Sequence, residues 1–147
     1  MTVSASIDFD VKAPPSVVMD VLRDVESLPS WSGPHKEAEI VTTDADGNPD
    51  QVRVVVTAAG ISDEQLLTYT WTENSCTWDL VEANQLSEQH GVYTVTPTDD
   101  GGSHIDFTLE VELKIKLPGL IVKRAQKMAV ETARKGLQTE VERRAAE

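Results

Sequence analysis

The feature that most constrains the fold is a change of hydrophobic period near residue 118. Residues 104–116 alternate between apolar and polar side chains, and one face carries Ile105, Phe107, Leu109, Val111, Leu113 and Ile115. A period of two over this length predicts a β-strand that is buried on one face. After Pro118-Gly119, apolar residues recur every three or four positions up to about residue 144, which predicts one long amphipathic helix. This helix needs a sheet to cover its apolar stripe.

The rest of the chain predicts more strands of the same kind. Residues 3–11 alternate in the same way, and Pro14-Pro15 ends this strand and begins a short helix over residues 16–24. A second short helix or turn, interrupted by Pro29, is expected at residues 26–31. Turn signals then separate five further segments of strand length, at residues 36–43, 51–59, 63–73, 76–82 and 89–96.

This order of elements predicts an α+β fold, and 147 residues without repeats or linkers suit a single domain over residues 1–147. Strands joined by short hairpins form antiparallel sheets. We therefore expect a seven-stranded curved antiparallel sheet wrapped around the long C-terminal helix, with two short helices between the first and second strands.

The stripe of the long helix is rich in small residues, namely Ala125, Ala129, Ala133 and Gly136. A helix about 10 Å in diameter does not fill a wide concave sheet by itself. Small residues on such a stripe are consistent with an empty space and also with closer packing of helix on sheet. We expect a ligand-sized cavity between the sheet and the helix.

Charge is unevenly placed along the chain and excludes some partners. The formal net charge is −12, and residues 1–102 hold 18 of the 25 acidic residues but only 4 of the 13 basic ones. An acidic body repels phosphate backbones, so we expect no nucleic-acid partner. The basic C-terminal segment most simply balances this acidic body, and contact with an anionic membrane surface stays open as a second interpretation.

No targeting or membrane-spanning segment is expected. The longest nearly apolar stretch, residues 52–61, is far shorter than the roughly 20 residues of a spanning helix, so we expect no stable membrane insertion. The N-terminus lacks a basic region followed by an apolar run, and the single Cys76 cannot form a disulfide within the chain. We expect a cytoplasmic protein that is a monomer or a homodimer.

No metal or cofactor motif is visible in the sequence. His35, His90 and His104 are scattered, and Cys76 has no second cysteine near it. Gly101-Gly102 leads into a strand rather than a helix, so a phosphate-binding loop is unsupported. We expect no metal and no cofactor. His90 lies opposite in parity to Tyr93 and is expected to face solvent.

Large aromatic residues on the strands and apolar residues on the helix are the candidate pocket lining. Buried Trp and Tyr can shape an apolar site and orient a ligand through a polar group, although ordinary core packing is an equally good interpretation of them. The predicted lining residues are Trp31, Tyr69, Trp71, Trp78, Tyr93, Phe107, Ile121, Ala125 and Met128.

Three polar residues are possible pocket groups, namely His35, Arg53 and Gln89. His35 follows a loop, and no partner for a general acid or base is visible in the sequence. A buried unpaired Arg is costly, so Arg53 is more simply a solvent-facing residue on a Val-rich strand.

Two segments resemble the START-like superfamily, in its polyketide cyclase/dehydrase and lipid-transport branch. Residues 13–18 read Ala-Pro-x-x-x-Val at the end of the first strand, and residues 24–31 read Asp-x-x-x-x-Pro-x-Trp. The Asp-Gly hairpin, the Gly-Ser-His-Ile strand start and the Leu-Pro-Gly helix start also agree, so the resemblance spans nearly the whole chain. It implies a helix-grip domain with an apolar pocket between the sheet and the C-terminal helix.

Members of this superfamily bind lipids, sterols, polyketides, hormones or quinones, and some close and aromatise polyketide rings. The resemblance therefore predicts a pocket better than it predicts a reaction. Our leading hypothesis is that the chain carries or senses a hydrophobic small molecule such as a lipid, polyketide or quinone-like compound. Few acid or base candidates point inward, so catalysis is uncertain.

Two alternatives remain open. One is a polyketide aromatase/cyclase (dehydrase) of the same fold, which would be favoured if His35, Arg53 or Asp79 converged in one cavity. The other is a protein-interaction domain with a vestigial cavity, which would be favoured by a filled interior and a large exposed apolar patch.

Overall fold

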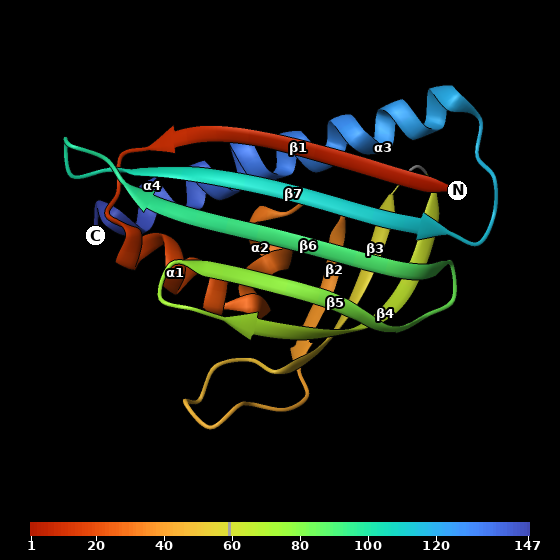
Figure 1. The fold of residues 1–147 in the computed structure, drawn as a ribbon, viewed down its shortest axis with the longest axis horizontal. Coiled ribbons are helices and arrows are strands. Elements are labelled where there is room, and N and C mark those ends of the chain that lie inside the picture. The colour runs from red at the N-terminus through yellow and green to blue at the C-terminus, as the bar shows by residue number, and fades with distance from the viewer. Residues whose placement is uncertain (59) are drawn as a thin grey trace.

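The strands form one antiparallel sheet in the order β1-β7-β6-β5-β4-β3-β2. Figure 1 shows this computed structural model, which describes residues 1–58 and 60–147. The predicted end of the third strand, at residue 59, lies outside the described residues. The strands are β1 (Thr2–Val11), β2 (His35–Ile40), β3 (Gln51–Ala58), β4 (Ile61–Trp71), β5 (Ser75–Ala83), β6 (Leu86–Pro97) and β7 (Ser103–Leu113).

The predicted α+β fold with seven strands and a long C-terminal helix is confirmed, although several strand ends differ from the prediction by up to three residues. The second strand stops at Ile40, and β7 stops at Leu113 although the alternation continues to Lys116. Leu113 pairs with Leu86, the first residue of β6, while Thr2 at the start of β1 pairs with Glu112. Residues beyond 113 therefore have no neighbouring strand to bond, and they form the connection to the helix.

The connection between β1 and β2 contains two short helices, α1 (Pro15–Arg23) and α2 (Leu28–Trp31). A one-turn 3-10 helix, η1 (Val25–Ser27), lies between them. Pro15 lies in the first turn of α1, where its missing N–H costs nothing. Val18, Met19, Val21 and Leu22 of α1 are all buried.

The C-terminal helix is continuous and crosses the concave side of the sheet behind β1 and β7 (Figure 1). It consists of α3 (Gly119–Glu131), a wider π-helical segment η2 (Thr132–Leu137) and α4 (Gln138–Ala145). Its two halves are packed differently. Ala133, Leu137 and Val141 are fully buried in the second half, whereas α3 contains no buried residue.

The core lies at the end of the molecule where α1 and α4 meet the sheet. One cluster joins α1, the second half of the long helix and strands β5, β6 and β7, with Met19, Ile105 and Leu137 among its largest buried side chains. Gly136 belongs to this packed end, because a Cβ atom there would overlap the backbone oxygen of Trp31. The small residues of this half of the stripe therefore serve close packing.

Among the described residues, no helix combines the length and the apolar character that crossing a membrane requires.

Candidate functional site

A cavity of about 250 Å³ lies between the concave face of the sheet and α3. Its walls come from β1, β3, β4, β5, β6, β7, α3 and the segment around α2, and most of them are apolar. Ala125 and Ala129 of α3 line it, so the first half of the small-residue stripe faces open space. Ile115 and Met128 also line it and are 46% and 37% exposed, so the cavity meets solvent beside α3.

Four aromatic rings from four adjacent strands form one wall of this cavity, and we call them the aromatic floor. They are Tyr69, Trp78, Tyr93 and Phe107. Neighbouring ring centroids lie 5.9 Å apart for Tyr69 and Trp78, 5.7 Å for Trp78 and Tyr93, and 4.8 Å for Tyr93 and Phe107. Stacked or tilted pairs at these distances are favourable.

The end of α2 and the start of β2 bring Trp31 and His35 to the cavity wall. The Trp31 ring nitrogen donates to the Ser27 hydroxyl at 3.3 Å, while the fully buried Ser32 shares a hydrogen bond of 2.6 Å between its hydroxyl and His35 Nδ1. Burial lowers the pKa of His35 from 6.5 to about 4. His35 is therefore neutral at neutral pH and lines the cavity as an uncharged imidazole.

Three further ionisable groups on the wall, Tyr69, Tyr93 and Cys76, are also uncharged. Burial raises the pKa of Tyr69 and of Tyr93 well above its usual value of 10, and the nearby Cys76 adds to the rise in both. Burial likewise raises the pKa of the Cys76 thiol, although Arg23 works against that rise. These groups stay neutral at physiological pH, so this part of the wall suits an uncharged ligand.

A row of hydrogen-bonded polar side chains crosses the remaining wall, and we call it the polar row. Trp78 Nε1 donates to Gln89 Oε1 at 3.0 Å, and Gln89 Nε2 donates to Gln65 Oε1 at 3.0 Å. Gln65 Nε2 donates to Asp63 Oδ2 at 3.4 Å. All four line the cavity, and Asp63 and Gln65 are each only 6% exposed.

Sequence reasoning named Gln89 but missed Asp63 and Gln65. The signal was available, because both share the parity of Leu67 and Tyr69 on β4 and must therefore face the same side. The bonds between them could not be foreseen, because they depend on the register of β4 and β6 across β5.

Most of the predicted lining residues reach the cavity, but Trp71 and Ile121 do not. Trp31, Tyr69, Trp78, Tyr93, Phe107, Ala125 and Met128 line it, as do His35 and Gln89. Trp71 lies further along β4 toward α1, where its Nε1 donates to Pro49 O at 2.7 Å and Arg23 sits 5.9 Å from its ring. Ile121 lies beside the stripe, and Val122 takes the place on the wall.

Arg53 also lies outside the cavity. The inward positions of β3 belong to Val52 and Val54, which are fully buried, so Arg53 points to the outer face. There it lies near three carboxylates, with nitrogen–oxygen distances of 3.4 Å to Glu37, 3.9 Å to Glu39 and 3.7 Å to Glu64.

Asp79 and His90 form a pair on the outer face of the sheet, with 2.6 Å between Asp79 Oδ1 and His90 Nδ1. Both side chains are about half exposed, as expected for His90 from its parity. His35, Arg53 and Asp79 therefore do not converge in one cavity.

The pairing of β1 with β7 gathers His104 and three carboxylates on the surface. His104 Nδ1 lies 2.6 Å from Asp10 Oδ1, and Nε2 lies 3.1 Å from Asp8 Oδ2 and 3.9 Å from Asp106 Oδ2. The hydrogen bond to Asp10 and the charges of all three carboxylates raise the pKa of His104 above 6.5. His104, Asp8 and Asp106 are close enough together to ligate a cation. We assign none, because both ring nitrogens are already held by carboxylates.

Comparison with known proteins gives a consistent result. The family model described as polyketide cyclase/dehydrase and lipid transport matches residues 1–146. Search of curated proteins finds no match. A START superfamily protein from Mycobacterium smegmatis is 25% identical over 98% of this chain and 97% of its own, with a TM-score of 0.81.

Two further solved structures share the architecture. A protein from Thermus thermophilus is 25% identical over 94% of this chain and 96% of its own, with a TM-score of 0.79. The Zhui aromatase/cyclase from Streptomyces sp. R1128 has a TM-score of 0.83 over 98% of this chain and 96% of its own. At 17% identity, this last likeness concerns the fold alone.

Proposed function

Because the chain belongs to the polyketide cyclase/dehydrase and lipid-transport family and has its START-like fold, we propose that it binds a hydrophobic small molecule in the cavity beneath α3. The ligand is a lipid, polyketide or quinone-like compound, carried or sensed rather than converted. The observation that carries this proposal is the open space under α3, a helix with an apolar stripe and no buried residue. We treat residues 1–147 as one domain that supplies the whole site.

The size and lining of the cavity support this proposal. A dry cavity of roughly 150 Å³ is known to admit benzene, so about 250 Å³ leaves room for a larger ring system. The aromatic floor offers stacking faces, and the neutral groups around it impose no charge requirement. The ligand best suited to these walls is uncharged, largely apolar and flat.

Binding is better supported than cyclisation. A cyclase needs groups that move protons at the reacting carbons. His35 places an imidazole on the wall, while Arg53 and Asp79 bond to partners on the outer face. The interaction hypothesis is less well supported, since it would call for a filled interior.

The proposal is tested by native mass spectrometry of the purified protein, followed by thermal unfolding with fatty acids, sterols, anthraquinone and naphthoquinone. A ligand that binds only the folded state raises the melting temperature, by the equivalent of about 2.7 kcal/mol at one hundred times its Kd. We expect at least one flat apolar compound to do so.

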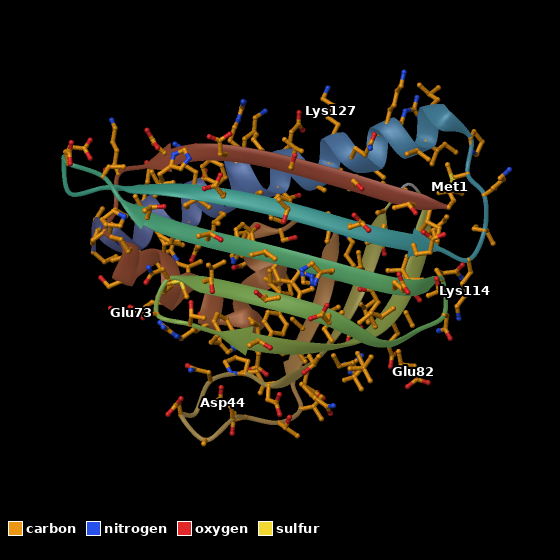
Figure 2. All side chains as sticks on the ribbon, in the orientation of Figure 1. Met1, Asp44, Glu73, Glu82, Lys114 and Lys127 are labelled. Atoms are coloured by element: carbon orange, nitrogen blue, oxygen red, sulfur yellow. The ribbon has the colours of Figure 1, made fainter. Side chains whose placement is uncertain are left out.

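Two matched variants show where such a ligand binds. Ala129→Phe places a ring inside the cavity and should abolish the shift. Lys127→Phe places the same ring on the outer side of α3, where Lys127 points away from the sheet (Figure 2), and should leave the shift intact. If no apolar compound shifts the wild type, or if both variants respond alike, the proposed site is wrong.

A further inference from the structure

We propose that Gln65 and Gln89 bind a neutral oxygen acceptor of the ligand, such as a ketone or quinone carbonyl, so that the cavity selects oxygenated ring compounds over hydrocarbons. This inference rests on the proposed function, because it presupposes a ligand on the aromatic floor. It names the substituent that the ligand must carry and the two side chains that recognise it.

The two ends of the polar row fix the orientation of both amides. The indole of Trp78 can only donate, so the Gln89 oxygen must face it and the Gln89 nitrogen must face Gln65. The carboxylate of Asp63 accepts, so the Gln65 nitrogen faces Asp63 and its oxygen faces Gln89. Neither amide can turn over without placing two donors or two acceptors against each other.

This fixed orientation leaves donors available on the cavity wall. Each amide nitrogen carries two hydrogens, and the row uses one from Gln65 and one from Gln89. An unpaired N–H in an apolar site is rarer and less well tolerated than an unused lone pair on oxygen. The remaining requirement of the row is therefore an acceptor, which a ligand oxygen can supply.

The turn between β5 and β6 keeps the row in place. Asp63 Oδ1 accepts from the backbone N–H groups of Asn84 at 3.0 Å and Gln85 at 3.2 Å. The Gln85 backbone oxygen in turn accepts from the Lys114 backbone N–H at 3.0 Å. Figure 2 shows Lys114 and Glu82 at this end of the sheet. The acceptor-only end of the row is thus anchored by backbone and does not depend on a flexible side chain.

Trp78 connects the polar row to the aromatic floor, since its ring packs against Tyr69 and Tyr93 while its nitrogen bonds Gln89. A ring that stacks on the floor therefore places an edge substituent near Gln89 and Gln65. The carboxylate of Asp63 at the far end disfavours an anionic substituent, because like charges repel strongly where water is scarce. A neutral carbonyl meets both conditions.

The test compares two uncharged probes of the same shape, 2-acetylnaphthalene and 2-isopropenylnaphthalene, which differ by a carbonyl oxygen in place of a methylene. Affinities are measured by quenching of tryptophan fluorescence. A net hydrogen bond corresponds to about threefold to tenfold in Kd, so the wild type should bind the ketone more tightly by that factor.

Three variants locate the effect. Gln65→Leu and Gln89→Leu should bind the two probes equally. Their affinity for the hydrocarbon should stay within about twofold of wild type, and this unchanged affinity also shows that the variants fold. Gln126→Leu is the matched control. Gln126 also lines the cavity and also keeps one amide hydrogen, because its Nε2 donates once, to Ser4 O at 2.7 Å. If the polar row makes the contact with the carbonyl, the Gln126 variant should keep the ketone preference.

A measurement on the wild type needs no variant. In ¹⁵N spectra, the side-chain amide signals of Gln65 and Gln89 should move when the ketone is added and stay in place with the hydrocarbon. Equal affinity of the wild type for both probes overturns this inference and leaves the cavity proposal standing. Failure of both probes to bind overturns this inference, and the thermal unfolding series with fatty acids, sterols and quinones then decides the cavity proposal.

Discussion

Burial decides the charge of single residues at this site, and His35 is the clearest example. Its ring lines an apolar cavity and shares a hydrogen bond with the hydroxyl of the buried Ser32. His104 shows the opposite behaviour, since carboxylates on the surface raise its pKa while burial lowers that of His35. Position in the fold therefore assigns a neutral role to one histidine and a cationic tendency to the other.

The lowered pKa of His35 makes stability depend on pH in a defined direction. Its pKa is about 4 in the folded protein against 6.5 in the unfolded chain, so the unfolded chain binds the proton more readily between these values. The contribution of neutral His35 is complete above pH 6.5 and is lost as pH falls toward 4. At 1.36 kcal/mol per pKa unit, this loss is about 2 kcal/mol at pH 4.5.

The measurement is urea unfolding of the wild type and His35→Gln at pH 7 and pH 4.5. Carboxylates titrate in both proteins, so the difference between the two proteins isolates His35. The wild type should lose about 2 kcal/mol more than the variant on acidification. An equal loss in both would show that His35 becomes protonated in the folded protein as easily as in the unfolded chain.

At the scale of elements, the contact between β5 and β6 holds the aromatic floor in place. Gly91 pairs directly with Trp78, and a Cβ atom at residue 91 would overlap atoms Cε2 and Cζ2 of the indole ring. The ring therefore lies flat over the backbone of β6, where it can reach both Gln89 and its aromatic neighbours. A glycine is required at this point because the ring occupies the space of a side chain.

Gly91→Ala should displace Trp78 and break its bond to Gln89. Overpacking of this kind costs about 1–3 kcal/mol, and the displaced indole should show a changed emission maximum. Unfolding curves and tryptophan fluorescence measure the two effects. Gly33→Ala is the control, since nothing lies within 4 Å of a Cβ atom there, and it should be close to neutral. A variant at Gly91 with wild-type stability and emission would contradict this packing.

Side-chain parity could be predicted from the sequence because a strand has a fixed period of two. It placed Tyr93 inward and His90 outward, as the structure has them. Parity could not tell how far along a strand the cavity extends, which is why Trp71 was expected on the wall. A stripe of apolar residues also does not define the rotation of a helix about its axis closely enough to choose between neighbouring residues. For this reason Ile121 was predicted on the cavity wall, where the structure has Val122.

The same limit applies to the small residues of the long helix. Ala125, Ala129, Ala133 and Gly136 form one stripe in the sequence, and they serve two purposes in the structure. The first two line the cavity, and the last two pack at the core end. The difference depends on α1 and α2, which support only the second half of the helix, so nothing in the stripe itself could reveal it.

At the scale of the whole molecule, stability and the proposed binding function are separated along the long helix. The core between α1, α4 and the sheet contains the fully buried side chains Met19, Ile105 and Leu137. The opposite end leaves α3 above a hollow, where side chains lack neighbours on one side. The folded chain therefore tolerates an empty region because its other end is well packed.

This division predicts that filling the hollow makes the protein more stable and less able to bind. In Ala129→Phe, the added ring would bury apolar surface inside the cavity, which Ala129 lines, and cavity filling commonly adds about 0.5–2 kcal/mol. The variant should therefore unfold at higher urea concentration than the wild type when no ligand is present, and it should lose the ligand-induced rise in melting temperature. Lys127→Phe, with the same ring in solvent, should show neither change. If the variant gained stability and still bound the ligand, the ligand would have to bind elsewhere. If the variant lost stability, the space beneath α3 would be too small for an added ring, which would mean that the existing side chains already fill it.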